Sequence, residues 1–337
     1  MQRVKLKKMN KLLLIACLLI SANNLLFAQK NSKAVAVIFD SDMGPDYDDV
    51  GAITLLHAFA DQGKARILAT MASTKYPGVA AVLNTFNTYF KKPKIPVGVP
   101  KGWALELRDT QHWSDSVIAN YPHAIKQNDD AEDAIVLYRK ILAAQPDNSV
   151  TIITVGFLTN LDNLLKSQPD KYSPLDGMAL VKKKVAKLVS MAGKFPSGNE
   201  FNIDRHPEAS KNVFENWPTP VVFSGFEIGE KIKCGLPLIH NEHIKNSPVK
   251  DVFRISIPMA AEDTAGRMSW DETAVLVAVL GSESYYSLQC GKISVDAKTG
   301  ANTWANDNKS NQCYLVEKAK PEVVQNLINN LMMHQPR

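Results

Sequence analysis

The sequence predicts an α/β fold with a mostly parallel central sheet, helices on both faces of that sheet, and a C-terminal hairpin followed by a last helix. Short apolar runs bounded by turn residues alternate with helical patterns, as expected of parallel strands joined by crossover helices. The run at 149–156 is almost continuously apolar, which is typical of a strand buried on both faces. Neither an internal repeat nor a low-complexity linker interrupts the pattern, so we expect one domain over 29–337.

In the first half of this domain the two kinds of element follow each other regularly. Apolar runs that end at turn residues predict strands at 34–40, 65–73 and 95–102, the last of which enters a loop. Apolar residues at helical spacing predict helices at 50–63 and 78–90. Gly63 marks the end of the first helix, because glycine readily adopts the backbone conformation that terminates helices.

The second half continues in the same way and ends in antiparallel strands. An amphipathic pattern predicts a helix at 131–145, and Thr159 is a plausible cap for the helix expected at 157–167. Further strands are expected at 185–193 and 219–229, a helix at 270–281, a hairpin at 291–306, a strand at 312–319 and a final helix at 321–333. The carboxyl ends of the parallel strands are where such sheets bind ligands.

The first 28 residues are typical of a secretory signal peptide: a basic start, an apolar middle and a small-residue exit at Ala28. We therefore expect a periplasmic or secreted protein. The alternative is a lipoprotein signal, since Leu14, Ile15 and Ala16 precede Cys17 in a lipobox-like order. No later run is long and apolar enough to span a bilayer, so no membrane contact is expected after removal of the signal.

The net charge of +5 belongs to the signal and not to the domain. Five basic residues precede position 29, where no acidic residue occurs: Arg3, Lys5, Lys7, Lys8 and Lys11. The mature chain is therefore close to neutral, which argues against a nucleic-acid or anionic-membrane partner. A homo-oligomer is possible.

Three cysteines follow Cys17, and their spacing matches no metal site. Cys290 and Cys313 could form a disulfide across the C-terminal strands, because an exported chain permits one. Free buried cysteines are the alternative, and Cys234 is left over in either case.

A cluster of aspartates follows the first apolar strand: Asp40, Asp42, Asp46, Asp48 and Asp49. Two carboxylates about 5 Å apart repel by roughly 3 kcal/mol at an effective dielectric constant near 20, so something must offset their charge. A solvated acidic loop whose last aspartate caps a helix is one explanation. A hard cation such as Ca²⁺, held by carboxylate oxygens, is the other.

Four motifs in this order resemble the nucleoside hydrolase family of the inosine-uridine-preferring, Ca²⁺-dependent type. The family's Asp-x-Asp-x-Gly and following Asp-Asp are matched by Asp40, Asp42, Gly44, Asp48 and Asp49, and its Gly-x-Leu-Thr-Asn by Gly156, Leu158, Thr159 and Asn160. Its Glu-Phe-Asn and Pro-Glu-Ala are matched by Glu200, Phe201, Asn202, Pro207, Glu208 and Ala209, and its late helical aspartate by Asp271. The resemblance covers about 34–281 and implies a Rossmann-like fold in a divergent, secreted member of bacterial type.

The resemblance also implies roles for individual residues. Ca²⁺ would be held by Asp42, Asp49, Asp271 and the backbone carbonyl of Val155, and Asp42 would double as general base. Asp48, Glu200 and Asn202 would bind ribose hydroxyls, whereas Asn160 is expected to have a structural role. Because Pro45, Asp46 and Tyr47 add two positions to the family's loop, Asp46 is an alternative for the role of Asp48 or Asp49.

The leaving-group side departs from the family pattern. Trp270 stands where members often carry a histidine that protonates the leaving group, and an indole can stack or donate a hydrogen bond but cannot shuttle a proton at neutral pH. His206 replaces an aspartate before Pro207, and His112 lies in the long loop after the third strand. Both are candidate acids, with a structural role as the alternative for His206.

The resemblance implies an enzyme with a small-molecule substrate. It would hydrolyse the N-glycosidic bond of ribonucleosides, or of a related ribosyl compound, through an oxocarbenium-like transition state. One alternative is a catalytically weak relative that binds a sugar or nucleoside, since Trp270 removes the usual acid. A less favoured alternative is a phosphohydrolase of the haloacid dehalogenase type, suggested by a strand ending in Asp-x-Asp. That family usually has a threonine soon after the second aspartate, where this chain has Met43-Gly44-Pro45.

Overall fold

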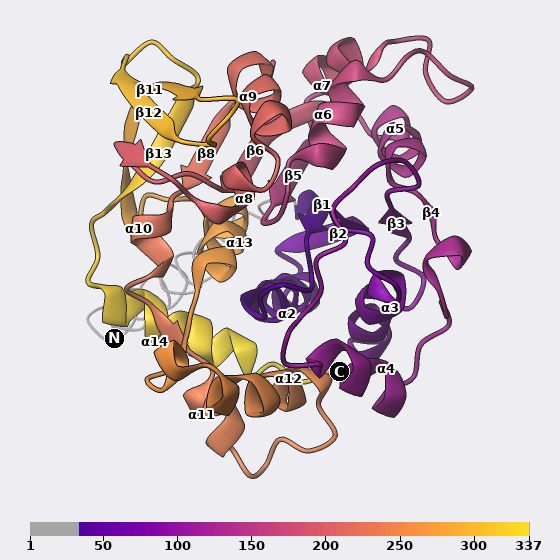
Figure 1. Cartoon of the computed structure of the whole chain (residues 1–337), viewed down its shortest axis with the longest axis vertical. Helices are drawn as coiled ribbons and strands as arrows, with labels where there is room; N and C mark the ends of the chain where they lie inside the picture. Colours follow the sequence, from indigo (N-terminus) through magenta and orange to yellow (C-terminus); the bar gives the residue numbers. More distant parts are fainter. Residues whose placement is uncertain (1–33, 337) are drawn as a thin grey trace, which may run out of the picture. The chain divides into compact units, whose positions relative to one another are not determined.

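The computed structural model describes residues 34–336. These residues contain an eleven-stranded sheet (Figure 1). Its strands, in spatial order, are β4 (Glu132–Asp133), β3 (Val97–Val99), β2 (Ala65–Ala72), β1 (Val35–Ser41), β5 (Val150–Thr154), β6 (Val185–Met191), β8 (Val221–Ser224), β13 (Gln312–Glu317), β11 (Tyr286–Val295), β12 (Asn302–Asn306) and β7 (Ser197–Gly198). In this spatial order the first eight strands, from β4 to β13, pair in parallel. The last three, β11, β12 and β7, add antiparallel pairs at one end. The predicted mostly parallel α/β sheet is confirmed.

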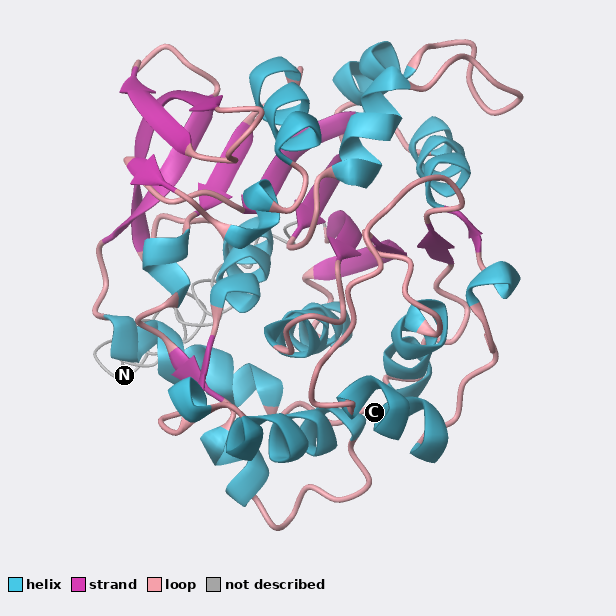
Figure 2. Cartoon of the chain, viewed as in Figure 1, coloured by secondary structure: helices cyan, strands magenta, loops and turns pink. Residues whose placement is uncertain are grey.

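Helices connect the strands and cover both faces of the sheet (Figure 2). The principal helices are α2 (Asp48–Asp61), α3 (Val79–Tyr89), α4 (Trp113–Asn120), α5 (Ala134–Ala144), α6 (Thr159–Lys166), α7 (Gly177–Lys184), α9 (Pro207–Asn216), α12 (Pro248–Ser256), α13 (Trp270–Leu280) and α14 (Pro321–Met332). Shorter ones are α8 (Phe201–Asp204), α10 (Phe226–Gly229) and α11 (Leu236–His240), and a two-stranded ribbon pairs β9 (Lys233–Cys234) with β10 (Arg267–Met268). No helix among the described residues combines the length and apolarity needed to cross a bilayer.

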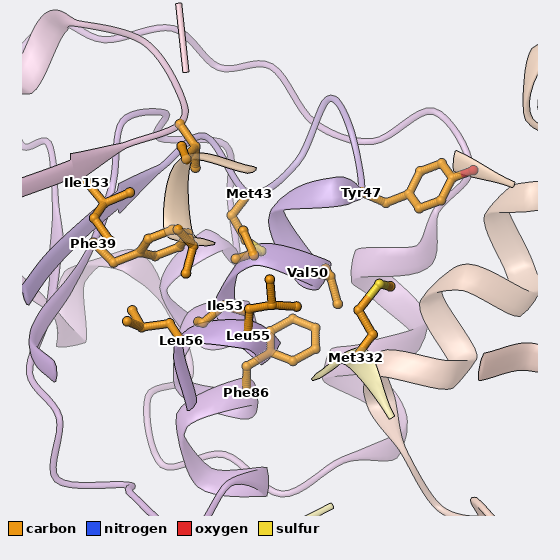
Figure 3. Close-up of a cluster of buried hydrophobic side chains, with 14 of the residues drawn as sticks. Phe39, Met43, Tyr47, Val50, Ile53, Leu55, Leu56, Phe86, Ile153 and Met332 are labelled. Atoms are coloured by element: carbon orange, nitrogen blue, oxygen red, sulfur yellow. The ribbon is translucent and has the colours of Figure 1, made fainter. Parts of the chain in front are cut away.

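Two apolar cores lie on opposite faces of the sheet, and alternate residues of β1 belong to them. Val37 and Phe39 pack into the core with α2 and α13, whereas Ala36 and Ile38 pack into the core with α5 and α6. Figure 3 shows the first of these cores, where side chains of β1 and α2 pack together. Burial on both faces explains why the central strands are apolar throughout.

Most predicted elements occur within a few residues of their expected bounds, but one strand is partly wrong. The segment expected as a single strand at 219–229 is β8 only as far as Ser224, and Phe226–Gly229 forms α10. The chain turns at Gly225 and the following residues pack against α13, so tertiary contacts override the local apolar pattern. Thr159 is the first residue of α6 and makes no cap, because Leu158 occupies that position.

The C-terminal part contains the predicted hairpin, β11 and β12, and the predicted last helix, α14. Cys290 and Cys313 lie directly opposite each other on β11 and β13 and form a disulfide, whereas Cys234 is free and buried. The disulfide that the sequence left open is therefore present. The predicted signal peptide at 1–28 and the alternative lipid attachment at Cys17 lie outside the described residues, so both, and the domain limit at position 29, stay predictions.

Candidate active site at the carboxyl edge of the sheet

A cavity of about 340 Å³ opens where the carboxyl ends of β1, β5 and β6 meet the start of α13. It is lined by every residue predicted as a metal ligand or substrate contact: Asp42, Asp46, Asp48, Asp49, Val155, Glu200, Asn202, Trp270 and Asp271. The remaining lining residues are Pro45, Met191, Phe201, Phe226, Glu262, Arg267 and Met268. Residues up to 229 positions apart in the chain therefore meet in one place, as the parallel-sheet rule predicts.

The turn after β1 packs Asp42 against Gly156, the residue that follows Val155, and the absence of a side chain there makes this approach possible. A Cβ atom at Gly156 would lie 2.4 Å from the Asp42 nitrogen and 2.5 Å from the Ser73 hydroxyl oxygen. Any larger residue at this position would push the two segments apart. The glycine of the Gly-x-Leu-Thr-Asn motif is thus explained by the close packing of the segment after β5 against the aspartate loop.

Asp49 projects from the first turn of α2 and has one oxygen atom without a partner. Its Oδ1 accepts hydrogen bonds from the Ser41 hydroxyl at 2.5 Å and from the Met43 amide at 3.2 Å. Its Oδ2 is buried and has no hydrogen-bond donor among the described residues. A buried carboxylate oxygen normally has a partner, so this atom indicates a place for a cation or a water.

The three predicted acidic ligands share an environment that disfavours their charge. Burial, followed by the neighbouring carboxylates, raises the pKa of Asp42 and of Asp271 well above the usual range of aspartate. Burial and the nearby Asp48 raise the pKa of Asp49 to about 7. A cation among these groups would reverse the effect, because it favours the ionised form of each carboxylate.

Both carboxylate oxygens of Asp48 accept hydrogen bonds from distant parts of the chain. Its Oδ1 accepts hydrogen bonds from Nε and Nη2 of Arg267, at 3.1 and 2.9 Å, and its Oδ2 accepts one from the Trp270 amide at 3.2 Å. The Asp271 amide lies 3.4 Å from the same Oδ2. Asp48 thus joins the start of α2 to the start of α13.

Arg267 was not predicted from the sequence, although it is the one cationic side chain among the lining residues that the structure describes. Its Nη2 also lies 2.8 Å from Asp46 Oδ1, and its Nη1 lies 3.6 Å from Asp263 Oδ2. The sequence shows only that Arg267 is a basic residue close to Asp271 and that an acidic cluster lies far away in the chain. Nothing local showed that the two segments pair.

Asp46 differs from Asp48 because part of its carboxylate is still accessible. About 46% of its side chain is exposed, and Arg267 is its only ion-pair partner among the described residues. Asp46 therefore has acceptor capacity that faces the cavity, as expected if the two added loop positions give it a role of its own.

Glu200 and Asn202 are held by backbone groups at the other side of the cavity. Glu200 accepts hydrogen bonds from the amides of Asn202, Gly193 and Ile203, at 2.8, 3.0 and 3.3 Å, and its burial raises its pKa to about 7. Asn202 donates through Nδ2 to the carbonyls of Val155 and Met191, at 3.2 and 3.1 Å. Its Oδ1 is left for another donor.

Trp270 forms a wall of the cavity, and its ring nitrogen is already used. Nε1 donates a hydrogen bond to the Phe226 carbonyl at 2.8 Å, and the two ring centroids lie 5.2 Å apart. A Cβ atom at Gly229 would lie 2.4 Å from the indole, so α10 packs directly on this side chain. The indole is therefore fixed as a stacking surface, and its N–H is not available to a leaving group.

Neither candidate histidine lines the cavity. His112 precedes α4, is largely exposed and pairs with Asp115 at 3.2 Å. His206 precedes α9, where its Nδ1 lies 2.9 Å from the Thr159 hydroxyl and its ring meets Trp103 edge to face. Burial lowers the pKa of His206. The structure thus gives His206 the hydrogen bond expected of a structural residue.

Asp40 and Asn160 support the site from below without lining the cavity. Asn160 Nδ2 donates to the Asp40 carboxylate, at 3.1 Å to Oδ2, and to the Ala72 carbonyl at 2.8 Å, while the Tyr138 hydroxyl donates to Asp40 Oδ2 at 2.7 Å. These bonds link β1, β2, α5 and α6 beneath the aspartate loop. They agree with the structural role expected of Asn160.

A known protein family matches most of this chain. The family model described as inosine-uridine preferring nucleoside hydrolase matches residues 37–326. A curated relative, the pyrimidine-specific ribonucleoside hydrolase RihA of Salmonella enteritidis, is 30% identical over 235 residues, which are 65% of this chain and 69% of the relative.

Two solved structures share the fold at low identity. A plant nucleoside hydrolase superposes with a TM-score of 0.67 at 19% identity, covering 89% of this chain and 99% of that one. The purine-preferring ribonucleoside hydrolase of Gardnerella vaginalis superposes with a TM-score of 0.67 at 16% identity, covering 88% and 99%. The family match shows that this chain is an N-glycosyl hydrolase that belongs to the inosine-uridine preferring nucleoside hydrolase family.

Proposed function

We propose that the chain cleaves the N-glycosidic bond of a ribonucleoside or related ribosyl compound with the help of a calcium ion, using Asp42 as general base. The observation that carries this proposal is the meeting of Asp42, Asp49 and Asp271 with the Val155 carbonyl in one cavity. These groups come from β1, α2, α13 and the end of β5, so only the folded chain assembles them.

The donor set fits a hard cation. Three carboxylates and one backbone carbonyl are oxygen ligands of the kind that Ca²⁺ prefers, and the unpartnered Asp49 Oδ2 is a free acceptor. No three acidic, histidine or cysteine side chains within residues 34–336 already stand in a closed metal-binding arrangement, so the ion itself remains part of the proposal. When bound, calcium would offset the carboxylate charge and lower the pKa of a water in its shell.

The protein's own groups would then carry the remaining steps. Asp42 accepts the proton of the attacking water, and the surrounding carboxylates stabilise the positive charge that develops on the ribosyl ring. Asp46 and the free Oδ1 of Asn202 are the acceptors best placed to take hydrogen bonds from ribose hydroxyls, with Glu200 holding Asn202 in position. Asp48 contributes mainly by fixing Arg267 and α13.

On the leaving-group side, Trp270 supplies a flat surface and no proton. We assign it to stacking, with Phe226 beside it. Protonation by His206 or His112 is the alternative, and it requires either side chain to reach a cavity that it does not line in this structure.

Ribose release, measured on the purified domain with calcium present, tests this function. We expect reducing sugar from inosine, uridine or p-nitrophenyl riboside, and a loss of at least about 100-fold in kcat for Asp42→Asn, because a general base typically contributes 10²–10⁴-fold. Phosphate release from a phosphoester panel would favour the phosphohydrolase, and nucleoside binding without any product would favour the binding protein. Full activity in Asp42→Asn would contradict the assignment of the base.

Export is the setting we propose for this activity. The N-terminal pattern of a signal peptide and the disulfide between Cys290 and Cys313 both support a periplasmic or secreted enzyme. N-terminal sequencing of the mature protein distinguishes cleavage after Ala28 from a lipoprotein that begins at Cys17. Sedimentation of the same sample gives its oligomeric state.

A further inference from the structure

We propose that the leaving-group side of this cavity selects cationic N-ribosides, in which the ring nitrogen bonded to ribose carries a positive charge, as in an N-ribosylpyridinium. The inference rests on the proposed ribohydrolase function and adds the chemical class of the substrate. Three features support this inference: the negative charge of the lining, its aromatic walls, and the hydrogen bond that the Trp270 N–H already makes to the Phe226 carbonyl.

The lining is strongly acidic. Seven carboxylates surround the cavity, and a single guanidinium accompanies them: Asp42, Asp46, Asp48, Asp49, Glu200, Glu262 and Asp271 against Arg267. Arg267 is itself balanced by Asp46, Asp48 and Asp263. Even with a divalent cation bound, the lining keeps more negative than positive charge, and ribose brings none.

Glu262 is the carboxylate that neither the metal nor the ribose accounts for. It lies in the short helix Ala261–Asp263, is exposed at the cavity, and has no ion-pair partner among residues 34–336. At a separation of about 6 Å in a medium of dielectric constant near 40, one such charge attracts a cation by roughly 1.4 kcal/mol, a factor of about ten in affinity.

The aromatic walls suit the same kind of ligand. Trp270 and Phe226 lie 5.2 Å apart at an interplanar angle of 33°, and each already has a cation over its ring. Arg267 lies 5.1 Å from the Trp270 ring, and Lys194 lies 5.0 Å from that of Phe226. Aromatic faces attract cations through their quadrupole, and both rings line the cavity, so the faces that Arg267 and Lys194 leave free offer a surface that accepts a flat, positively charged ring.

Cleavage of a cationic riboside needs no proton donor. The bond between the anomeric carbon and the ring nitrogen breaks, and its electron pair moves to nitrogen, which cancels the charge. The heterocycle leaves as a neutral molecule. Water adds to the anomeric carbon, and its proton passes to Asp42. A neutral purine requires protonation to leave equally easily. Trp270 cannot supply that proton, because an indole N–H does not ionise at neutral pH, and this one already bonds to the Phe226 carbonyl.

Two ligands of the same shape and different charge provide the test. N-ribosylnicotinamide carries the positive charge, and its C-riboside analogue, C-ribosylbenzamide, is neutral and cannot be cleaved. Both are measured as competitors of p-nitrophenyl riboside hydrolysis at low and high salt. We expect an inhibition constant about ten times lower for the cation at low salt, because exposed charges are weakly screened there, and a smaller difference at high salt.

Glu262→Gln should reduce the ratio of the two inhibition constants about three- to tenfold. Glu242→Gln, a matched change in an exposed loop, should leave this ratio unchanged. Equal constants for the two ligands would overturn the inference, and so would a difference that Glu262→Gln does not narrow. If p-nitrophenyl riboside is cleaved, the proposed function stands in either case. If no riboside is cleaved, the proposed function fails, and calorimetric titration with the same pair decides whether the cavity prefers the cation.

Discussion

Arg267 binds a single oxygen of Asp48 with two of its nitrogen atoms, Nε at 3.1 Å and Nη2 at 2.9 Å, and both side chains are buried. The pair joins α2 to the strand before α13, which are 219 positions apart in the chain. Through the Trp270 and Asp271 amides, the same carboxylate also orients the start of α13. This contact therefore holds two of the proposed calcium ligands, Asp49 and Asp271, on facing helices.

Replacing Arg267 should destabilise the fold strongly. Arg267→Met leaves Asp48 and Asp263 buried without their cation, and removing one partner of a buried pair costs about 3–5 kcal/mol of unfolding free energy. Arg254→Met, which breaks the exposed pair with Asp251, should cost at most about 1 kcal/mol. Urea unfolding of both variants gives the two values, and similar losses would show that the Arg267 pair has no special role.

Asp46 and Asp48 should separate into a binding residue and a positioning residue. Asp46→Ala removes an acceptor with free capacity, so we expect KM to rise about tenfold or more with little change in the free energy of unfolding. Asp48→Asn disrupts the contact with Arg267, so the free energy of unfolding should fall by about 3 kcal/mol. Steady-state kinetics and urea unfolding check both. The reverse pattern would return the ribose role to Asp48.

His57 should make the protein sensitive to acid at a site far from the cavity. Burial on α2 lowers its pKa from 6.5 to about 3, with Lys92, Asp61 and His334 nearby and Asn87 bonded to Nε2 at 3.0 Å. The folded state keeps His57 neutral, whereas the unfolded state binds a proton at this residue below pH 6.5. His57 therefore does not reduce the free energy of unfolding above pH 6.5, and reduces it progressively as the pH falls toward 3. The free energy of unfolding should fall by about 1.4 kcal/mol for each pH unit in this window.

The control for this pH effect is a variant that cannot titrate. His57→Leu should show a shallower decline between pH 6.5 and pH 4.5 than the wild type, whereas His112→Leu, at an exposed position, should follow the wild type. Parallel curves for the wild type and His57→Leu would mean that His57 is not held neutral by the fold.

Trp270 should matter more for binding than for turnover. Trp270→Ala removes a stacking wall, so we expect KM to rise more than kcat falls for p-nitrophenyl riboside, whose leaving group needs little protonation. The wild type should cleave this substrate much faster than inosine or uridine. Trp270→His, His206→Ala and His112→Ala complete the series. If inosine proved as good a substrate, and neither histidine-to-alanine variant slowed it, the site would need an acid that we have not identified.

The aspartate loop and the central strands could be predicted because their signals are local. Asp42 and Asp49 directly follow an apolar strand, and the parallel-sheet rule then places them at the binding edge. Arg267 could not be predicted in this way, since its two partners in the aspartate cluster, Asp46 and Asp48, lie about 220 positions earlier in the chain. Its role depends on how α13 packs against α2, which no local pattern records.

Two other differences have the same origin. Phe226–Gly229 was expected to extend a strand, but it is a helix because its apolar residues pack on Trp270 and α13. His206 is a candidate acid by its place in the motif, yet its ring bonds to Thr159 on α6. In both cases the deciding contact is tertiary, and the local sequence is compatible with either outcome.

Ribose release should depend on calcium, because the proposed site is complete only with the ion bound. The protein is freed of metal with a chelator, and release of ribose from p-nitrophenyl riboside is followed as Ca²⁺ is added, with calorimetry giving the number of ions bound. We predict no turnover without metal, recovery as one ion binds, and a loss of both binding and recovery in Asp271→Asn. Full activity in the chelated protein, with no binding of calcium, would show that Asp42, Asp49 and Asp271 do not form a calcium site that catalysis needs.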